Sequence, residues 1–269
     1  MSAIKSILIS LVLLYLVVGF LLFALQEQFI FLPEKLERDY QFSFKHPFTE
    51  HFLTTPEDGE IHLLYFESDS SKGTILYFHG NAGSLRRWGE VAQPFIELGF
   101  EIIISDYRSY GKSTGQLNQQ ALLSDADAIY EFAKNISNES DLILFGRSLG
   151  SGFASYLAGK NQPRQLILET PFYSLNDVAQ KTFFLFPTKL FLRYQLNNAA
   201  YLEGSTLPIT LFHGTADNVV PYASGLKLAK TLDPEKYDFI TIENGGHNDL
   251  GSYPMYWEEM EKVLTAKIN

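Results

Sequence analysis

Short, continuously apolar runs alternate with amphipathic stretches through most of the chain. Continuous apolar runs are typical of strands covered on both faces of a sheet, and apolar residues spaced three or four apart are typical of helices. This alternation predicts a mostly parallel sheet with helices on both faces. The predicted strands are Ile61–Phe66, Thr74–Phe78, Glu101–Ser105, Leu142–Phe145, Gln165–Leu168, Ile209–Phe212 and Tyr237–Ile242. The predicted helices are Leu85–Leu98, kinked or split by Pro94, Gln119–Lys134, Leu149–Lys160, Tyr222–Thr231 and Tyr253–Lys267.

The N-terminus is a segment of its own. From Ile7 to Leu25 the chain is apolar except at Ser10 and Gly19. A membrane-spanning helix needs roughly 20 apolar residues, whereas the core of a signal peptide has roughly 7–15. No small-x-small cleavage site follows, so we favour an uncleaved, single-pass anchor over a cleaved signal peptide. Lys5 on the N-terminal side predicts a catalytic domain on the non-cytoplasmic face.

One interval interrupts the alternation. A segment of about forty residues, rich in aromatic side chains, separates the strand near Glu169 from the one at Ile209. This segment is long for a simple crossover connection between two strands. The rings are either the core face of crossover helices or the inner face of a small lid that receives an acyl chain, and both interpretations can hold for different rings. The rings are Phe172, Tyr173, Phe183, Phe184, Phe186, Phe191, Tyr194 and Tyr201.

Composition narrows the class of protein. Hydrophobic residues make up 46% of the chain and charged residues 19%, as in a folded domain. The chain has a net charge of −10, whereas a nucleic-acid-binding protein needs a basic surface, so we do not expect a nucleic-acid partner. The chain has no cysteine, which excludes disulfides, thiolate nucleophiles and thiolate metal sites.

The candidate nucleophile is Ser148, in the G-x-S-x-G sequence Gly146–Gly150. A nucleophile elbow requires a buried strand, a sharp turn and a helix, with small residues that permit the strained turn. The apolar run Leu142–Phe145 precedes the motif, and the small-residue stretch 151–158 follows it. This context predicts that the Ser148 hydroxyl projects from the C-terminal edge of the sheet.

A second G-x-S-x-G sequence, Gly111–Gly115, lies in a polar context that predicts a loop. Its Gly-Lys-Ser also resembles the end of a phosphate-binding P-loop. That motif needs a glycine five residues before Gly111, where Asp106 stands instead. A carboxylate would repel a phosphate, so we expect no nucleotide ligand.

The candidate base is His247, because a serine hydroxyl needs a nearby histidine to remove its proton. His247 lies in a glycine-rich loop, 244–249, between the last strand and the terminal helix, which is the position of the base in the α/β-hydrolase order Ser–acid–His. No histidine pair has the spacing of a zinc-binding helix, so we expect no metal site and no cofactor. Of the other five, His79 and His213 precede glycines at strand ends, where bonds to backbone are expected, and His46, His51 and His62 precede the core sheet.

The candidate acid is Asp217, which directly follows the penultimate strand and would bond the far nitrogen of His247. Asp217 could instead cap the helix after Pro221. Asp249 is too near His247 in sequence to face its ring easily. For the oxyanion hole we predict the backbone N–H of Leu149 and that of Asn81, with Ala82 as the alternative to Asn81.

With these loops in place, the chain resembles the membrane-anchored, Bem46-like branch of the α/β-hydrolase superfamily over about residues 50–265. The resemblance implies an N-terminal anchor and activity on acyl esters or thioesters. Ser109 departs from the pattern, since the family usually has glycine there. The motifs are FHGNAGS at Phe78–Ser84, DYRSYGKS at Asp106–Ser113, GRSLGSG at Gly146–Gly152, HGTADNVVP at His213–Pro221 and GGHND at Gly245–Asp249.

The expected organisation is a membrane anchor at 1–28, a connecting segment at 29–55 and an α/β-hydrolase domain at 56–269, with a lid-like insertion at about 171–206. The leading function is hydrolysis of a small-molecule or lipid acyl ester or thioester through an acyl-Ser148 intermediate. Two alternatives stay open: a peptidase or amidase on the same triad, and a non-catalytic, membrane-tethered binding module.

Overall fold

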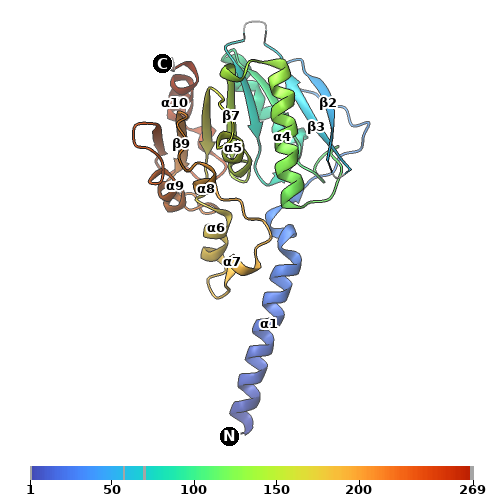
Figure 1. The fold of residues 1–269 in the computed structure, drawn as a ribbon, viewed down its shortest axis with the longest axis vertical. Coiled ribbons are helices and arrows are strands. Elements are labelled where there is room, and N and C mark those ends of the chain that lie inside the picture. Colours follow the sequence, from blue (N-terminus) through green and yellow to red (C-terminus); the bar gives the residue numbers. More distant parts are fainter. Residues whose placement is uncertain (1, 57, 69–70, 267–269) are drawn as a thin grey trace.

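The computed structural model describes residues 2–56, 58–68 and 71–266 and has a three-layer α/β/α architecture (Figure 1). Its centre is an eight-stranded sheet in the order β10-β9-β8-β7-β4-β6-β3-β2. Strands β4 to β10 of this sheet run parallel, and β3 and β2 add an antiparallel edge. The strands are β2 (Thr49–Thr55), β3 (Gly59–Phe66), β4 (Thr74–Phe78), β6 (Glu101–Ser105), β7 (Leu142–Arg147), β8 (Gln165–Glu169), β9 (Ile209–Gly214) and β10 (Tyr237–Ile242).

Two separate cores lie on the two faces of the sheet, because successive side chains of a strand point to opposite faces. In β7, Leu142 and Leu144 contribute to one core, while Ile143 and Phe145 contribute to the other. The continuously apolar strands predicted from the sequence are therefore confirmed. Helices α4 (Gln119–Ile136), α5 (Gly150–Ala158) and α9 (Tyr222–Ala229) cover the first face, and α2 (Leu85–Trp88), α3 (Ala92–Glu97) and α10 (Pro254–Thr265) cover the second.

The predicted helix at 85–98 is split, but the break precedes Pro94. A 3-10 turn over Gly89–Val91 separates α2 from α3. Pro94 lies in the first turn of α3, where its missing N–H leaves no hydrogen bond unmade. Further 3-10 turns span Glu139–Asp141 and Leu250–Ser252. Lys267, the predicted end of the last helix, lies outside the described residues.

The segment after the anchor contains structure that the sequence pattern did not reveal. Strand β2 forms the antiparallel edge of the sheet, although its residues fall within the stretch expected to be a connection. Two further short strands, β1 (Leu32–Pro33) and β5 (Ala82–Gly83), pair in parallel beside the loop that contains Asn81. A strand at the edge of a sheet is less buried than a central strand, so it needs fewer apolar residues and its sequence pattern is harder to recognise.

Helix α1 (Ser2–Ile30) projects from the body (Figure 1) and is long and apolar enough to cross a membrane. The insertion expected at residues 171–206, called the lid below, holds α6 (Leu175–Thr182), α7 (Thr188–Phe191) and α8 (Asn198–Tyr201). The rings of this insertion divide into two groups, and a role in receiving an acyl chain stays a prediction. Phe172 and Tyr194 belong to the core, whereas other rings turn towards α1.

Candidate active site

The strand–turn–helix corner at Ser148 has the geometry of a nucleophile elbow. Strand β7 ends at Arg147 and α5 begins at Gly150, so the whole turn is made by two residues. Ser148 has φ +51°, a left-handed conformation that is strained for a residue with a side chain. Its N–H donates to the Glu169 carbonyl oxygen at 2.9 Å, which ties the corner to the neighbouring strand β8.

The glycines of the motif are required by close approach of the backbone. A Cβ on Gly150 would lie 2.0 Å from the carbonyl oxygen of Phe78, at the end of β4. A Cβ on Gly146 would lie 2.7 Å from the Ala154 side chain on α5. Glycine at both positions lets α5 pack directly on the sheet and aim its N-terminus at the site.

His247 meets Ser148 at this corner. The Nε2 atom of His247 lies 2.9 Å from the Ser148 hydroxyl oxygen, although the residues are far apart in sequence. The glycine-rich loop allows this approach because it passes tightly over the end of β9, where a Cβ on Gly214 would lie 2.1 Å from the Gly245 carbonyl oxygen. The loop that was predicted to hold the base therefore reaches the predicted nucleophile.

Asp217 completes the chain of hydrogen bonds. Its Oδ2 atom lies 2.7 Å from Nδ1 of His247, and its Oδ1 atom accepts hydrogen bonds of 2.9 Å from the N–H groups of Val219 and Val220. One oxygen of Asp217 therefore faces the base and the other stabilises the turn before α9. The alternative that Asp217 caps α9 is wrong, because Pro221 is the N-cap and, among the described residues, no side chain caps this helix. Asp249 accepts instead from the Gly246 N–H.

The environment of Asp217 favours its ionised form. Burial by itself would raise the pKa of this carboxyl, but hydrogen bonds from His213, His247 and the backbone hold the pKa well below its usual value. His213 lies with Nε2 3.0 Å from the Val220 carbonyl oxygen and 3.3 Å from Asp217 Oδ2. The expected backbone bond of His213 is present, and the contact with Asp217 is an addition that the sequence did not reveal.

The second G-x-S-x-G sequence has a different role. Ser113 is buried, its hydroxyl donates to the Asp106 carbonyl oxygen at 3.1 Å, and it accepts from the His62 N–H at 2.9 Å. These bonds tie the loop of Ser113 to strand β3 and to the residue that follows strand β6. Ser109, the departure from the family pattern, adopts φ +65°, the conformation that the family's usual glycine would favour.

Asn81 and Leu149, the predicted oxyanion-hole residues, both line the cavity that contains Ser148. Within the described residues, neither backbone N–H donates a hydrogen bond, so both donors remain available. The Asn81 loop is held from behind, since its carbonyl oxygen accepts from the Leu32 N–H at 2.9 Å and from the Tyr110 hydroxyl at 2.7 Å. The chain that leaves α1 therefore supports this loop.

Arg147 is a site residue that the sequence reasoning missed. It occupies the first x position of the G-x-S-x-G motif, directly before Ser148, and its Nη2 atom lies 3.3 Å from the His247 carbonyl oxygen. Its Nε atom pairs with Glu169 at 3.1 Å, and Glu169 also accepts from the Tyr256 hydroxyl at 2.7 Å. An arginine beside the nucleophile was the available signal. Its buried ion pair ties the base-bearing loop to β7 and β8.

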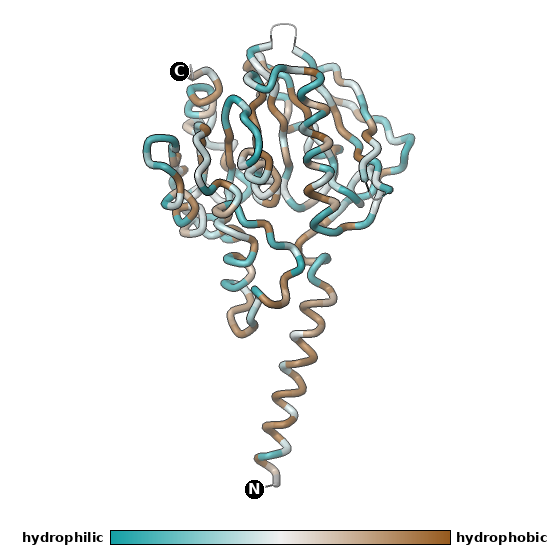
Figure 2. Tube along the Cα trace, in the orientation of Figure 1, coloured by the Kyte–Doolittle hydropathy of each residue, from teal (hydrophilic) through white to brown (hydrophobic). Residues whose placement is uncertain are grey.

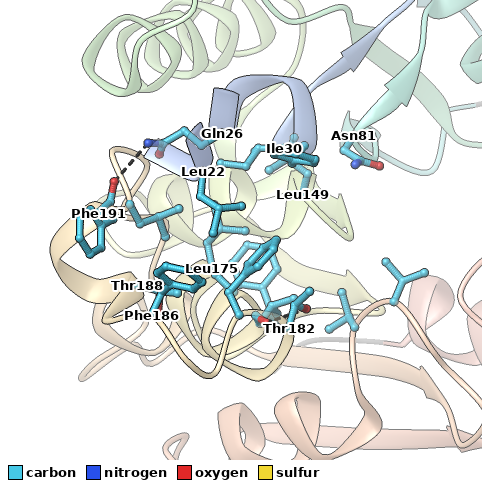
Figure 3. A pocket seen from close by; sticks show the side chains of 18 of the residues that line it. Leu22, Gln26, Ile30, Asn81, Leu149, Leu175, Thr182, Phe186, Thr188 and Phe191 are labelled. Atoms are coloured by element: carbon cyan, nitrogen blue, oxygen red, sulfur yellow. Dashed lines mark hydrogen bonds between the residues drawn. The ribbon is translucent and has the colours of Figure 1, made fainter. Parts of the chain in front are cut away.

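The cavity at Ser148 has a volume of about 370 Å³ and a mostly apolar lining. Figure 3 shows the side chains of most of the residues that line it. This volume falls within the roughly 300–1,000 Å³ of ligand pockets. Its walls come from three parts of the chain: the catalytic corner, the lid and the C-terminal part of α1. The lining residues are Gly19, Leu22, Gln26, Phe29, Ile30, Asn81, Ser148, Leu149, Phe172, Leu175, Val178, Ala179, Thr182, Phe183, Phe186, Thr188, Phe191, Leu192, Val219 and Val220.

A serine on a strand–helix corner, hydrogen-bonded to a histidine from the last loop of a mostly parallel sheet, defines the α/β-hydrolase class. A family model described as "Serine aminopeptidase, S33" matches residues 69–203. The chain belongs to this family of hydrolases. The matched range includes Ser148 and ends before Asp217 and His247.

Known proteins agree with this assignment. An uncharacterized protein of Acanthamoeba polyphaga mimivirus is 32% identical over 225 residues, covering 74% of this chain and 75% of that protein. Alpha/beta hydrolase domain-containing protein 17C of Mus musculus is 29% identical over 227 residues, covering 81% of this chain and 68% of that protein. These relatives also fit the resemblance to the Bem46-like branch.

Solved structures show the same fold at low sequence identity. An esterase from Pyrococcus furiosus superposes with a TM-score of 0.67 at 17% identity, covering 87% of this chain and 96% of that one. Acetyl xylan esterase 1 from Thermoanaerobacterium superposes with a TM-score of 0.66 at 18% identity, covering 86% and 87% respectively. The predicted α/β-hydrolase fold is confirmed.

Proposed function

We propose that the protein is a membrane-tethered serine hydrolase that cleaves esters or thioesters of apolar acyl chains. The observation that carries the proposal is the 2.9 Å contact between Ser148 and His247 on the wall of an apolar cavity. The contact supplies an activated nucleophile, and the cavity suits an acyl chain because it offers few polar partners.

In the proposed mechanism Ser148 is the nucleophile, His247 is the base and Asp217 is the acid that orients the base. His247 Nε2 removes the hydroxyl proton as Ser148 Oγ attacks the acyl carbonyl, and Asp217 stabilises the imidazolium through Nδ1–H. The N–H groups of Asn81 and Leu149 donate to the oxyanion. His247 then protonates the leaving alcohol or thiol, and a water, deprotonated by His247, releases the acid from the acyl-serine.

The lining of the cavity favours an acyl ester over an N-terminal peptide. An aminopeptidase must bind the positively charged α-amino group of its substrate, which calls for a nearby carboxylate. None of the described residues that line this cavity is charged. Desolvating an ammonium group there without a partner would be costly.

Helix α1 supplies the proposed tether. The exposed surface of the helix is almost entirely apolar, and inserting it in a bilayer removes that surface from water. Retention of α1 as an uncleaved anchor also fits its contribution of Gly19 and Leu22 to the cavity wall. The placement of the catalytic domain on the non-cytoplasmic face stays a prediction.

The test is fluorophosphonate labelling combined with hydrolysis of nitrophenyl esters of increasing chain length. Ser148→Ala should abolish labelling and turnover with an unchanged melting temperature. The matched control is Ser113→Ala, which alters the other G-x-S-x-G serine and should still be labelled. Ser148-independent turnover, or faster cleavage of an aminoacyl nitroanilide than of any ester, would overturn the proposal.

A further inference from the structure

The membrane helix is itself a wall of the proposed acyl pocket. Gly19, Leu22, Phe29 and Ile30 of α1 line the same cavity as Ser148. Figure 3 shows Leu22 and Ile30 among the side chains of this lining. A tether that only held the enzyme near the membrane would need no contact with the site. The cavity lies between α1 and the lid, so the proposed acyl pocket adjoins the helix that would cross the bilayer.

The lid is hydrogen-bonded to α1 at two points, one near each end of the stretch along which the two segments lie side by side. At one end, the Gln26 side chain donates to the Phe191 carbonyl oxygen at 3.1 Å and accepts from the Arg193 N–H at 2.7 Å. At the other end, the Tyr15 hydroxyl donates to the Leu185 carbonyl oxygen at 2.9 Å. An α-helix rises ~1.5 Å per residue, so Tyr15 lies about 16 Å from Gln26 along α1.

This distance equals the depth of one leaflet. Gln26 directly follows Leu25, the end of the apolar stretch, and so marks the edge of the hydrocarbon layer. The hydrocarbon core of a bilayer is ~30 Å thick, so a point about 16 Å below its edge is near the midplane. When α1 spans a bilayer, the part of the lid bonded to Tyr15 must lie inside the leaflet.

The tip of the lid, residues 183–191, has the surface that such a position requires. Phe184, Leu185 and Leu190 are 71%, 68% and 82% exposed, and the Leu185 carbonyl oxygen is bonded to Tyr15 of α1. Figure 2 shows that most of the α1 trace is coloured as hydrophobic. Large exposed apolar groups of this kind mark interaction surfaces. Lys181 and Lys189 have long stems that let their ammonium groups reach the headgroups.

We propose that the lid tip inserts into one leaflet beside α1, and that the acyl chain of a membrane lipid enters the cavity laterally from that leaflet to reach Ser148. The acyl-ester part of this inference rests on the proposed function. The insertion of the lid rests on its contacts with α1 and on the exposed apolar side chains of the tip.

Insertion can be measured without any catalytic assay. The chain has no cysteine, so Phe184→Cys and Met255→Cys each offer one site for a nitroxide label. Met255 is the matched control, an exposed apolar residue on α10. In phosphatidylcholine nanodiscs, the label at 184 should relax faster with oxygen than with a water-soluble nickel chelate, and the label at 255 should show the reverse. A nickel-accessible label at 184 would overturn the proposal.

Lateral entry is tested with the double variant Phe184→Glu/Leu190→Glu, whose residues do not line the cavity, and with Met255→Glu as control. We expect at least a tenfold fall in kcat/KM for nitrophenyl palmitate in phosphatidylcholine vesicles, and less than a twofold change for nitrophenyl acetate in water. Equal effects on both esters, or no effect on either, would overturn lateral entry. If the wild-type protein cleaves neither ester, the proposed function fails, while the label accessibilities still decide insertion.

Discussion

Replacement of Asp217 by Asn tests the proposed triad with almost no change in side-chain shape. One carboxylate oxygen of Asp217 accepts from the Val219 and Val220 N–H groups, and the other faces Nδ1 of His247. An asparagine that keeps both backbone bonds must present its NH₂ group to His247. The ring then accepts at Nδ1 and holds its proton on Nε2, facing Ser148. In that tautomer His247 cannot act as the base.

The expected loss is large because the geometry allows no satisfactory alternative. If the amide turned over, its NH₂ group would face the two backbone N–H donors and leave them unpaired, at about 1–3 kcal/mol for each buried group. The wrong tautomer costs about 10⁴-fold in kcat in a serine-protease triad, which is about 5.5 kcal/mol of transition-state stabilisation. We therefore expect a fall in kcat of three to four orders of magnitude for Asp217→Asn.

The assay is steady-state hydrolysis of a short nitrophenyl ester, with the rate of fluorophosphonate labelling as a second readout. The matched control is Asp249→Asn, in the loop of His247. Asp249 bonds the Gly246 N–H rather than the histidine, and an asparagine oxygen can accept the same bond, so its kcat should stay within a few fold. If Asp217→Asn keeps more than a tenth of the wild-type kcat, Asp217 is not the orienting acid.

Three further predictions concern the corner, acid stability and topology. Gly150→Ala should cost about 1–3 kcal/mol of stability and abolish labelling, because its Cβ would meet the Phe78 carbonyl oxygen at 2.0 Å, whereas Gly251→Ala, whose Cβ has 3.8 Å of room, should be tolerated in the same melting assay. Burial lowers the pKa of His62 from 6.5 to about 4 in the folded protein, so the neutral buried ring contributes its full stabilisation above pH 6.5, and this stabilisation is lost as the pH falls to about 4. His62→Gln should therefore remove on the order of 3 kcal/mol of the fall in unfolding free energy between pH 6.5 and pH 4. An unchanged dependence of the unfolding free energy on pH would contradict the role of His62. The exposed acceptor sequences at 135–137 and 138–140 should gain glycans in microsomes if the catalytic domain is non-cytoplasmic, and a protein that stays unmodified would reverse the predicted orientation.

Much of the fold could be predicted because its signals are local. A strand buried on both faces must be apolar at successive positions, as in β7, and a nucleophile elbow must have small residues where backbone segments touch, as at Gly150. Even the meeting of Ser148 with His247 follows from parallel strands, whose C-terminal ends gather at one edge of the sheet. Strand β2 was missed because it lies at an edge and lacks a continuous apolar run.

The sequence by itself determined the α/β-hydrolase fold, the long apolar N-terminal helix and the residues proposed for the chemistry. Tertiary structure alone decided how the parts serve one another. It placed Arg147 against the loop of His247, and it laid the lid along α1 from Gln26 to Tyr15. The physical reason is range: periodicity and turn chemistry act between near neighbours in the chain, whereas these contacts join residues a hundred or more positions apart.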